Sequence, residues 1–178
     1  MSGIIEVNGE QKHQFDFRVA PFPQDVISEE ALAIGGVTEA QIREHKSPRE
    51  IYKVLITLLS KYVDRYDRND KFTMVGYRVD FDDQMLRSWF KKLGDQYYGS
   101  WFSGYRLDVY ALVCYLNLLG KMPTKSGKLR QEDVADLLGM EYDAHNSLED
   151  VRITRKLLYK FTEMFGYGGL LGEVEAHL

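Results

Sequence analysis

A histidine stands just ahead of a predicted helix in the stretch Ala144-His145-Asn146-Ser147-Leu148-Glu149-Asp150-Val151. The helix is expected to run on to about Phe165, so the carboxylate of Asp150 falls in its first turn. Much of the upstream chain is expected to act as a scaffold that presents this pair to a second acid, Asp82, in Phe81-Asp82-Asp83. A histidine and two converging carboxylates suit metal-assisted hydrolysis of a phosphodiester bond.

The composition is that of a mixed α/β protein with a real core. The chain has 178 residues, of which 44% are hydrophobic and 13% aromatic, enough for one domain. The net charge of -4 gives no general basic field for nucleic acid. This weakens a purely electrostatic DNA-binding function, but it leaves room for an enzyme that holds a few nucleotides through metal ions.

The cellular location is expected to be the cytoplasm. Cys114 is the only cysteine and lies in an apolar run, so no disulfide can form within the chain, which fits a reducing compartment. No apolar run reaches the roughly 20 residues that span a bilayer, and the N-terminus shows no signal-peptide pattern.

Strands are expected early in the chain and helices late, with two strands feeding helices. The Asn8-Gly9 turn joins the first two predicted strands. Apolar periodicity, Pro, Gly and cap residues delimit the other elements. The expected strands are 4–7, 14–19, 72–76 and 105–107, and the expected helices are 28–34, 38–42, a longer helix from Pro48, 81–93, 108–119, 129–138 and 148–165. This order predicts a mixed α/β sheet layered by helices.

Three segments, in this order, resemble the DEDDh family of 3′–5′ exonucleases, the family of the proofreading subunit of bacterial DNA polymerase III. They are residues 74–82 (MVGYRVDFD), 106–108 (RLD) and 145–150 (HNSLED). Residues 33–38 also resemble the family's Ile-His-Gly-Ile-Thr connection, with Gly35 in place of the histidine. The resemblance implies a ribonuclease-H-like mixed sheet flanked by helices, formed by an exonuclease-like domain over 1–166 with a tail over 167–178.

The resemblance also implies the chemistry of the site. In the family, four carboxylates hold two divalent metal ions, and the second and third motifs map onto Asp82, His145 and Asp150. Asp82 and Asp150 are then metal ligands and His145 is the general base. Mg²⁺ or Mn²⁺ is expected, because hard cations prefer carboxylate oxygens. Arg78, which replaces a family asparagine, and Phe81 are the candidate substrate-binding residues.

The family's first motif, Asp-x-Glu-Thr on its first strand, has no counterpart in this sequence. Asp16-Phe17-Arg18 does not fit, because its third residue is a cation. Two of the four carboxylates and the first strand are therefore expected to be missing. We expect weak metal binding and little or no turnover from this 178-residue polypeptide.

Each candidate also has an ordinary structural interpretation. Ser147 and Asp150 can form a capping-box-like helix start, and a lone histidine such as His145 is often a surface loop residue. Asp82 is chosen over Asp80 and Asp83 because it follows Phe81, as the family pattern requires. Asp108 matches a family acid after a strand, but a role as helix cap is at least as well supported.

Two further groups can contact nucleic acid or serve the fold alone. An aromatic group can stack on bases, although packing of the loop is favoured: Tyr97, Tyr98, Trp101, Phe102 and Tyr105. A basic group can meet a phosphate backbone, although a solvated loop is favoured: Lys121, Lys125, Lys128 and Arg130.

Three hypotheses follow. The first is an exonuclease-family domain that removes nucleotides from a free 3′ end of DNA or RNA, impaired by the absent motif. The second is a catalytically silent relative that binds nucleic acid or a protein. The third is a composite site completed by a strand from another chain, because an open sheet position invites strand addition or pairing in a homodimer.

Overall fold

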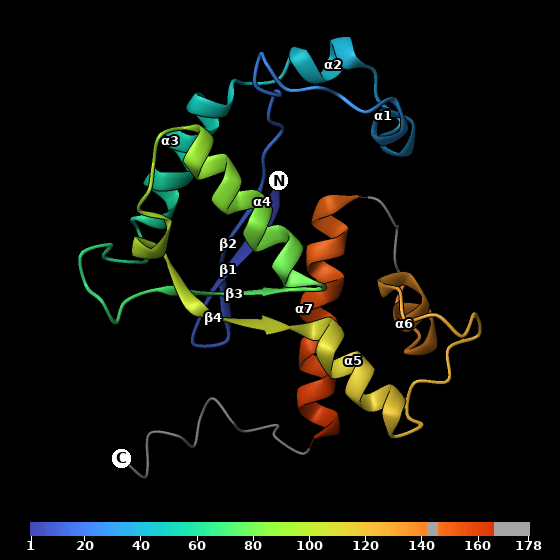
Figure 1. Cartoon of the computed structure of the whole chain (residues 1–178). Helices are drawn as coiled ribbons and strands as arrows, with labels where there is room; N and C mark the ends of the chain where they lie inside the picture. Colours follow the sequence, from blue (N-terminus) through green and yellow to red (C-terminus); the bar gives the residue numbers. More distant parts are fainter. Residues whose placement is uncertain (142–145, 166–178) are drawn as a thin grey trace. The chain divides into compact units, whose positions relative to one another are not determined.

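A computed structural model describes residues 1–141 and 146–165 of the chain (Figure 1). It confirms a mixed α/β fold in which small sheets are accompanied by helices. In chain order the elements are β1 (Ser2–Val7), β2 (Glu10–Asp16), α1 (Glu29–Gly35), α2 (Glu39–Arg43), α3 (Pro48–Leu59), β3 (Phe72–Gly76), α4 (Val79–Lys92), the 3-10 turn η1 (Tyr98–Ser100), β4 (Phe102–Asp108), α5 (Val109–Leu118), α6 (Gln131–Leu137) and α7 (Ser147–Met164). No helix of the described residues has the length and apolarity needed to cross a membrane.

The chain divides into two compact units. Unit 1 contains Met1, residues 17–74 and residues 80–107, and unit 2 contains residues 2–16, residues 75–79 and the chain from residue 108 onward. The chain thus passes between the units several times, and each unit is described by itself below.

Unit 1 is built on the packing of α3 against α4. Ser47 and Glu50 form a capping box at the start of α3, and Pro48 occupies its first turn, where a missing N–H costs nothing. One face of α3 is buried at helical spacing by Ile51, Leu55, Leu58 and Leu59. Tyr52 meets the rings of Trp89 and Phe90 of α4 edge-on, at 5.9 and 5.3 Å between centroids.

Strand β4 is longer than the predicted strand over 105–107, because β3 provides its partner. The two strands form one two-stranded sheet, and their arrows point the same way in Figure 1, as in a strand–helix–strand crossover. The backbone N–H of Phe72 donates to the carbonyl of Trp101 at 2.9 Å, and the hydroxyls of Thr73 and Ser103 lie 3.4 Å apart. Pairing therefore begins earlier than the local sequence suggests.

In unit 2, β1 and β2 form an antiparallel hairpin around a two-residue turn. Asn8 and Gly9 both have positive φ, 53° and 76°, as a type I′ turn requires. This turn makes β2 begin at Glu10, directly after it. The predicted second strand over 14–19 was therefore wrong in its bounds, and Val19 instead forms an isolated bridge with Lys46.

The outer edge of β1 is open in the described part of the chain. Met1 and Phe17 exchange two backbone hydrogen bonds of 2.8 Å. Because antiparallel residues alternate between bonded and non-bonded pairs, every second residue of β1 points its backbone groups away from β2. These residues are Ser2, Ile4 and Glu6. The sheet of β1 has only β2 as a partner strand among the described residues.

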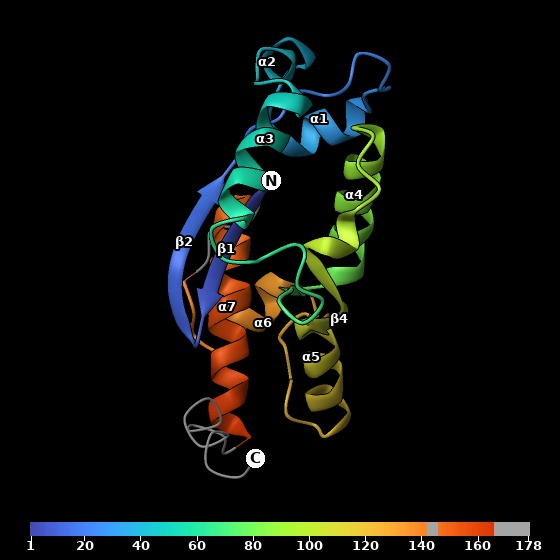
Figure 2. The ribbon, with the colours of Figure 1, turned by 90° about the vertical axis from the view of Figure 1, so that its left-hand side faces the viewer.

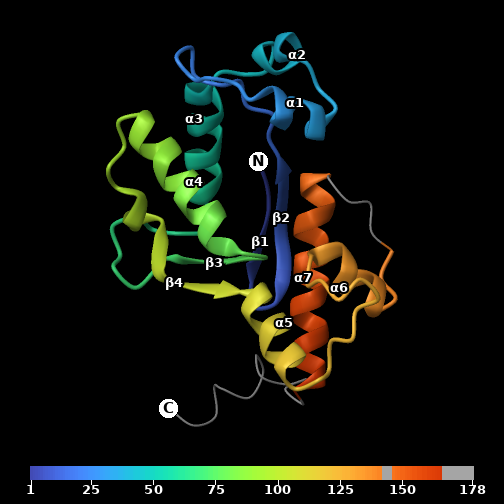
Figure 3. The same cartoon turned by 45° about the vertical axis from the view of Figure 1, so that its right-hand side comes forward.

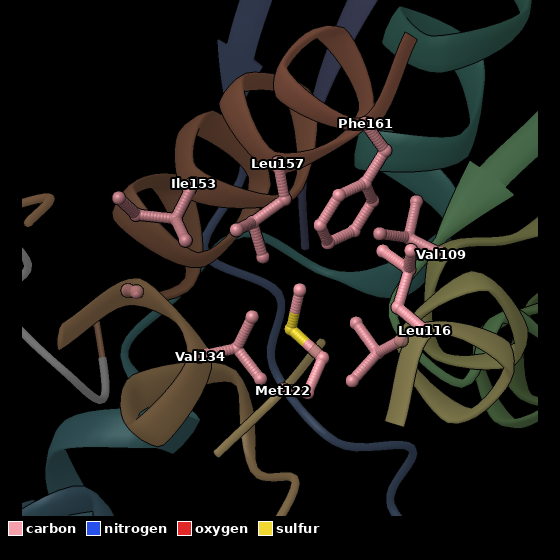
Figure 4. Packing of buried hydrophobic residues seen from close by; sticks show 9 residues of the cluster. Val109, Leu116, Met122, Val134, Ile153, Leu157 and Phe161 are labelled. Atoms are coloured by element: carbon pink, nitrogen blue, oxygen red, sulfur yellow. The ribbon is translucent and has the colours of Figure 1, made fainter. Parts of the chain in front are cut away.

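The core of unit 2 lies between α7 and its neighbours. Helix α7 contacts β1 and β2 (Figure 2) and also packs with α5 and α6 (Figure 3). Ile153, Leu157 and Phe161 of α7 point into a cluster completed by α5, α6 and the loop between them (Figure 4). The other buried members are Val109, Val113, Leu116, Met122, Val134 and Ala135.

The open edge of β1 gives a prediction for amide hydrogen exchange by NMR. The amides of Gly3 and Ile5, which face β2, should be protected, whereas those of Ser2, Ile4 and Glu6 should exchange faster by an order of magnitude or more, because exchange follows local opening and hydrogen bonding. Uniform protection of all five amides would show that another strand occupies this edge.

Candidate active site

The predicted site residues fall in different parts of the fold. Phe81 and Asp82 lie in the first turn of α4, where residues 80–92 belong to unit 1. Asp150 lies in the first turn of α7 in unit 2, and Arg78 lies in the unit 2 segment between β3 and α4. His145 lies outside the described residues. The grouping of His145, Asp82 and Asp150 around shared metal ions therefore stays a prediction.

The first turn of α4 presents Phe81 and Asp82 to solvent. The Phe81 side chain is 68% exposed, and Asp82 is also exposed. Asp83, the next residue, is only 4% exposed. Successive helical residues are about 100° apart around the axis, so one acid can enter the core while its neighbour faces outward.

Asp83 is held by three side chains inside unit 1. Its carboxylate accepts hydrogen bonds from the Tyr98 hydroxyl at 2.7 Å, from Arg87 Nε at 2.7 Å and from an Arg106 terminal nitrogen at 3.1 Å. The Arg87 guanidinium also stacks 4.3 Å from the centre of the Tyr98 ring. Burial by itself raises the pKa of Asp83, but the bonds from Arg87 and Tyr98 and the two positive charges outweigh it, so the net pKa is lowered.

The neighbouring acid Asp80 is also engaged, since it forms an ion pair with Arg106 Nε at 3.0 Å. Asp80 and Asp83 thus share Arg106. The buried member, Asp83, links the start of α4 to β4 through this arginine. Asp83 is therefore held inside unit 1, and Asp80 is paired at the surface. The choice of Asp82 as the metal ligand stays a prediction that rests on the family resemblance.

The turn before α4 is anchored by Asp108. Arg78 has φ +65°, a conformation that is uncommon for residues other than Gly and in which Asn is enriched. Its backbone N–H donates to Asp108 Oδ1 at 2.9 Å, and the same oxygen caps α5 by accepting from the Tyr110 N–H at 2.9 Å. Asp108 is therefore a helix cap that also fixes this turn. The Arg78 guanidinium stacks 4.5 Å from the Tyr110 ring and is exposed.

The start of α7 differs from the predicted capping box. Asn146 is the N-cap, and its side chain accepts from the Leu148 N–H at 3.1 Å. Ser147 is instead the first helical residue, and its hydroxyl lies 2.5 Å from that of Ser2. Ser2 in turn donates to Asp16 at 2.7 Å. The capping-box interpretation is wrong because Asn146, not Ser147, occupies the N-cap, and the Ser147 hydroxyl meets a partner from β1 instead.

Asp150 is half-buried, and its main chain is fixed on both sides. Its N–H donates to the Asn146 carbonyl at 2.9 Å. Its own carbonyl accepts from Gln131 Nε2 at 2.6 Å and from the Thr154 hydroxyl at 2.8 Å. A carboxylate in this first turn interacts favourably with the helix dipole. Asp150 therefore stabilises the start of α7, in addition to any role in binding.

The aromatic and basic groups are divided by burial and pairing. Tyr98 and Trp101 are 4% and 1% exposed and pack inside unit 1, whereas Tyr97 and Tyr105 are 67% and 84% exposed. In the basic group, Lys125 pairs with Asp136 at 2.9 Å. Arg130 likewise pairs with the acids of α6, so ion pairs of an exposed loop account for these two residues.

The donors offered to a metal ion fit a hard divalent cation in kind. Asp82 and Asp150 present carboxylate oxygens, which Mg²⁺ and Mn²⁺ prefer. Within the described residues, no group of three or more His, Cys, Asp or Glu side chains is placed to hold a metal. The described acids therefore fit the expected ions in chemistry but do not complete a ligand set.

Two comparisons find similar proteins. Residues 3–158 match the family model described as RNase_T, Exonuclease. A product-bound structure of exonuclease I is similar at a TM-score of 0.70 and 18% identity, and a structure of SSB/exonuclease I with the inhibitor CFAM at 0.71 and 18%. Both likenesses cover 92% of this chain but only 38% and 36% of the other chains. A search of curated proteins finds no match.

The network of Asp83, Tyr98, Arg87 and Arg106 was missed from the sequence, where Asp83 was considered only as an alternative to Asp82. One signal was available, since Asp83, Arg87 and Phe90 have helical spacing and Asp83 would lie on the same side as the apolar Phe90. The partners from η1 and β4 had no such signal, because they lie 15 and 23 positions away.

The contrast between Asp83 and Asp82 predicts effects on stability of very different size. Asp83→Asn should lower the free energy of unfolding by about 3 kcal/mol, the low end for a broken buried ion pair, because the arginines are partly exposed. Asp82→Asn should change it by about 0.5 kcal/mol or less, as for an exposed residue. Urea unfolding at pH 7 measures both.

The pH dependence of stability tests whether the ionised Asp83 carboxylate is the cause of this stabilisation. Since the folded-state pKa of Asp83 is lowered, its stabilisation is complete above the unfolded pKa, about 3.9, and is lost as pH falls through the lower folded value. The difference between the wild type and Asp83→Asn should therefore shrink below about pH 4. A difference that stays constant down to pH 2 would contradict a role for the ionised carboxylate.

Proposed function

The chain belongs to the RNase_T exonuclease family, and on that premise we propose that it is a metal-dependent domain acting on phosphodiester bonds at nucleic-acid 3′ ends. Membership confirms, at the level of the family, the resemblance to DEDDh-type 3′–5′ exonucleases. The observation that carries the proposal is the extent of the match, because residues 3–158 include Asp82, His145 and Asp150. The substrate is a strand of DNA or RNA with a free 3′ end, and the proposed location is the cytoplasm.

The residues divide the work as follows. Asp82 and Asp150 would hold the divalent ions, which activate water and stabilise the leaving oxygen in two-metal hydrolases. His145 takes the proton from the attacking water, a task suited to a group with a pKa near neutrality. Phe81 stacks on a terminal base, and Arg78 meets a phosphate with its exposed guanidinium.

The acids of residues 1–178 set a limit on activity. Asp82 and Asp150 are two of the four carboxylates that the family uses, and two closely spaced dications need several anionic ligands. We therefore expect this polypeptide by itself to bind Mg²⁺ or Mn²⁺ weakly and to turn over slowly.

A second candidate is a composite site, in which a strand from another polypeptide pairs with β1. The open backbone groups of Ser2, Ile4 and Glu6 favour it, because such an edge is a template for strand addition. The added strand, from a homodimer or a different partner, would bring the remaining acids. A relative that has lost catalysis and keeps only binding is the remaining alternative.

The proposal predicts slow shortening of a 5′-labelled oligothymidylate or oligouridylate from its 3′ end, with Mn²⁺ and protein in molar excess. His145→Ala should reduce the rate by about 100-fold or more, the usual contribution of a general base, and Asp82→Asn or Asp150→Asn should do the same by removing a metal ligand. Denaturing gels resolve the products.

Matched controls are available in the same helical turns. Asp80→Asn and Glu149→Gln each remove a carboxylate close to a proposed ligand, and both should leave the rate within about twofold. Rapid turnover by the wild type would refute the expected impairment. Shortening that survives all three active-site substitutions would remove the assigned residues, and a complete absence of shortening would favour the silent relative.

A further inference from the structure

An arginine in unit 1 is surrounded by aromatic rings in the loop between α3 and β3. The Arg65 guanidinium lies 5.0 Å from the ring centre of Trp101, 5.8 Å from that of Tyr66 and 5.9 Å from that of Tyr97. These four residues are called the Arg65 cluster. Within the described residues, aromatic rings surround the Arg65 guanidinium. By contrast, Arg87 of α4 and Arg106 of β4 pair with carboxylates.

Three members of the Arg65 cluster, namely Arg65, Tyr66 and Trp101, line a hollow of about 480 Å³. This volume lies in the range of roughly 300–1,000 Å³ found for small-ligand sites. The rest of the wall is mixed in charge and consists of Ser60, Lys61, Tyr62, Val63, Asp64 and Asp70.

Two acids, Asp64 and Asp70, also line the hollow, and each accepts a backbone hydrogen bond from within the loop. Asp64 accepts from the Tyr66 N–H at 2.9 Å, and Asp70 accepts from the Asp64 N–H at 2.7 Å. Lys71 Nζ donates to the carbonyls of Arg65 and Ser100 at 3.2 and 2.8 Å, which ties this loop to the Trp101 segment. The loop is therefore shaped before any ligand binds.

The exposed rings indicate which ligand fits. Tyr66 is 86% exposed and Tyr97 is 67% exposed, although both lie beside an arginine. Proteins bind single-stranded nucleic acid by stacking bases on such rings, with arginine adding a cation–π contribution. We propose that the Arg65 cluster binds a single-stranded part of the nucleic-acid substrate, away from the end that is cut. The inference rests on the proposed function for the identity of the substrate.

Unit 1 itself sets the distance from the cluster to Asp82. From Asp82 to Lys92 the axis of α4 rises about 15 Å at about 1.5 Å per residue. Tyr97 follows the far end of α4, where its N–H donates to Asp95 and the Asp95 N–H donates to the Phe90 carbonyl. At about 3.4 Å per stacked nucleotide, a strand needs more than about four nucleotides to reach both places.

The test is equilibrium binding of 5′-labelled dT15 and rU15 to the full chain, by fluorescence anisotropy in EDTA, where no hydrolysis occurs. Tyr66→Ala should weaken binding of dT15 or rU15 by about 5- to 100-fold, the range for one lost base stack. Comparing dT15 with rU15 shows which sugar the site accepts. Tyr66→Phe, which keeps the ring, should restore the wild-type affinity.

Arg68→Ala is the matched control for charge, because it removes an exposed cation from the same loop without touching the rings; it should weaken dT15 binding less than Arg65→Ala does. Wild-type affinity of Tyr66→Ala for both 15-mers overturns the inference, as does failure of the wild type to bind either. Because binding is measured without turnover, a chain that binds in this way but never cleaves would contradict the proposed function and leave the inference standing.

Discussion

The burial of the Asp83 carboxylate is the interaction on which the start of α4 depends. A buried charge is costly unless it is paired, and here a tyrosine hydroxyl and two arginines from three elements meet it. The position and rotation of α4 follow from this. With Asp83 turned into unit 1, Phe81 and Asp82 face solvent, which is the orientation that their proposed roles as substrate contact and metal ligand require.

Side chains also fix the turns that lead into the helices. They form hydrogen bonds with backbone groups that have no partner within the helix. Asp108 satisfies the first turn of α5 and also the strained turn at Arg78. Asparagine, which the resemblance places at this position in the family, adopts this left-handed conformation more readily than arginine does. Arg78 therefore adopts it at some conformational cost. In exchange, the position carries an exposed arginine side chain. At α7, Asn146, Gln131 and Thr154 fix the main chain on either side of Asp150.

Local patterns were sufficient for the mixed α/β class, the family and most helices. The apolar spacing of α3 and its Ser47-Pro48 start are examples. Boundaries set by distant partners were not predictable: β4 begins early because β3 pairs with it, and Ser147 bonds to Ser2 across the chain. Tyr98 and Tyr97 are adjacent and chemically identical, yet one is buried on Asp83 and the other is exposed, which only tertiary packing decides.

The central claim is that Asp82, His145 and Asp150 gather around shared divalent ions. Paramagnetic broadening by substoichiometric Mn²⁺ tests it directly, because it reports proximity to the ion even when binding is weak. The account predicts that the amide signals of residues 81–83, 145–146 and 149–151 broaden together at the lowest Mn²⁺ concentrations and recover together with EDTA. Broadening confined to one of these segments, or centred elsewhere in the chain, would contradict it.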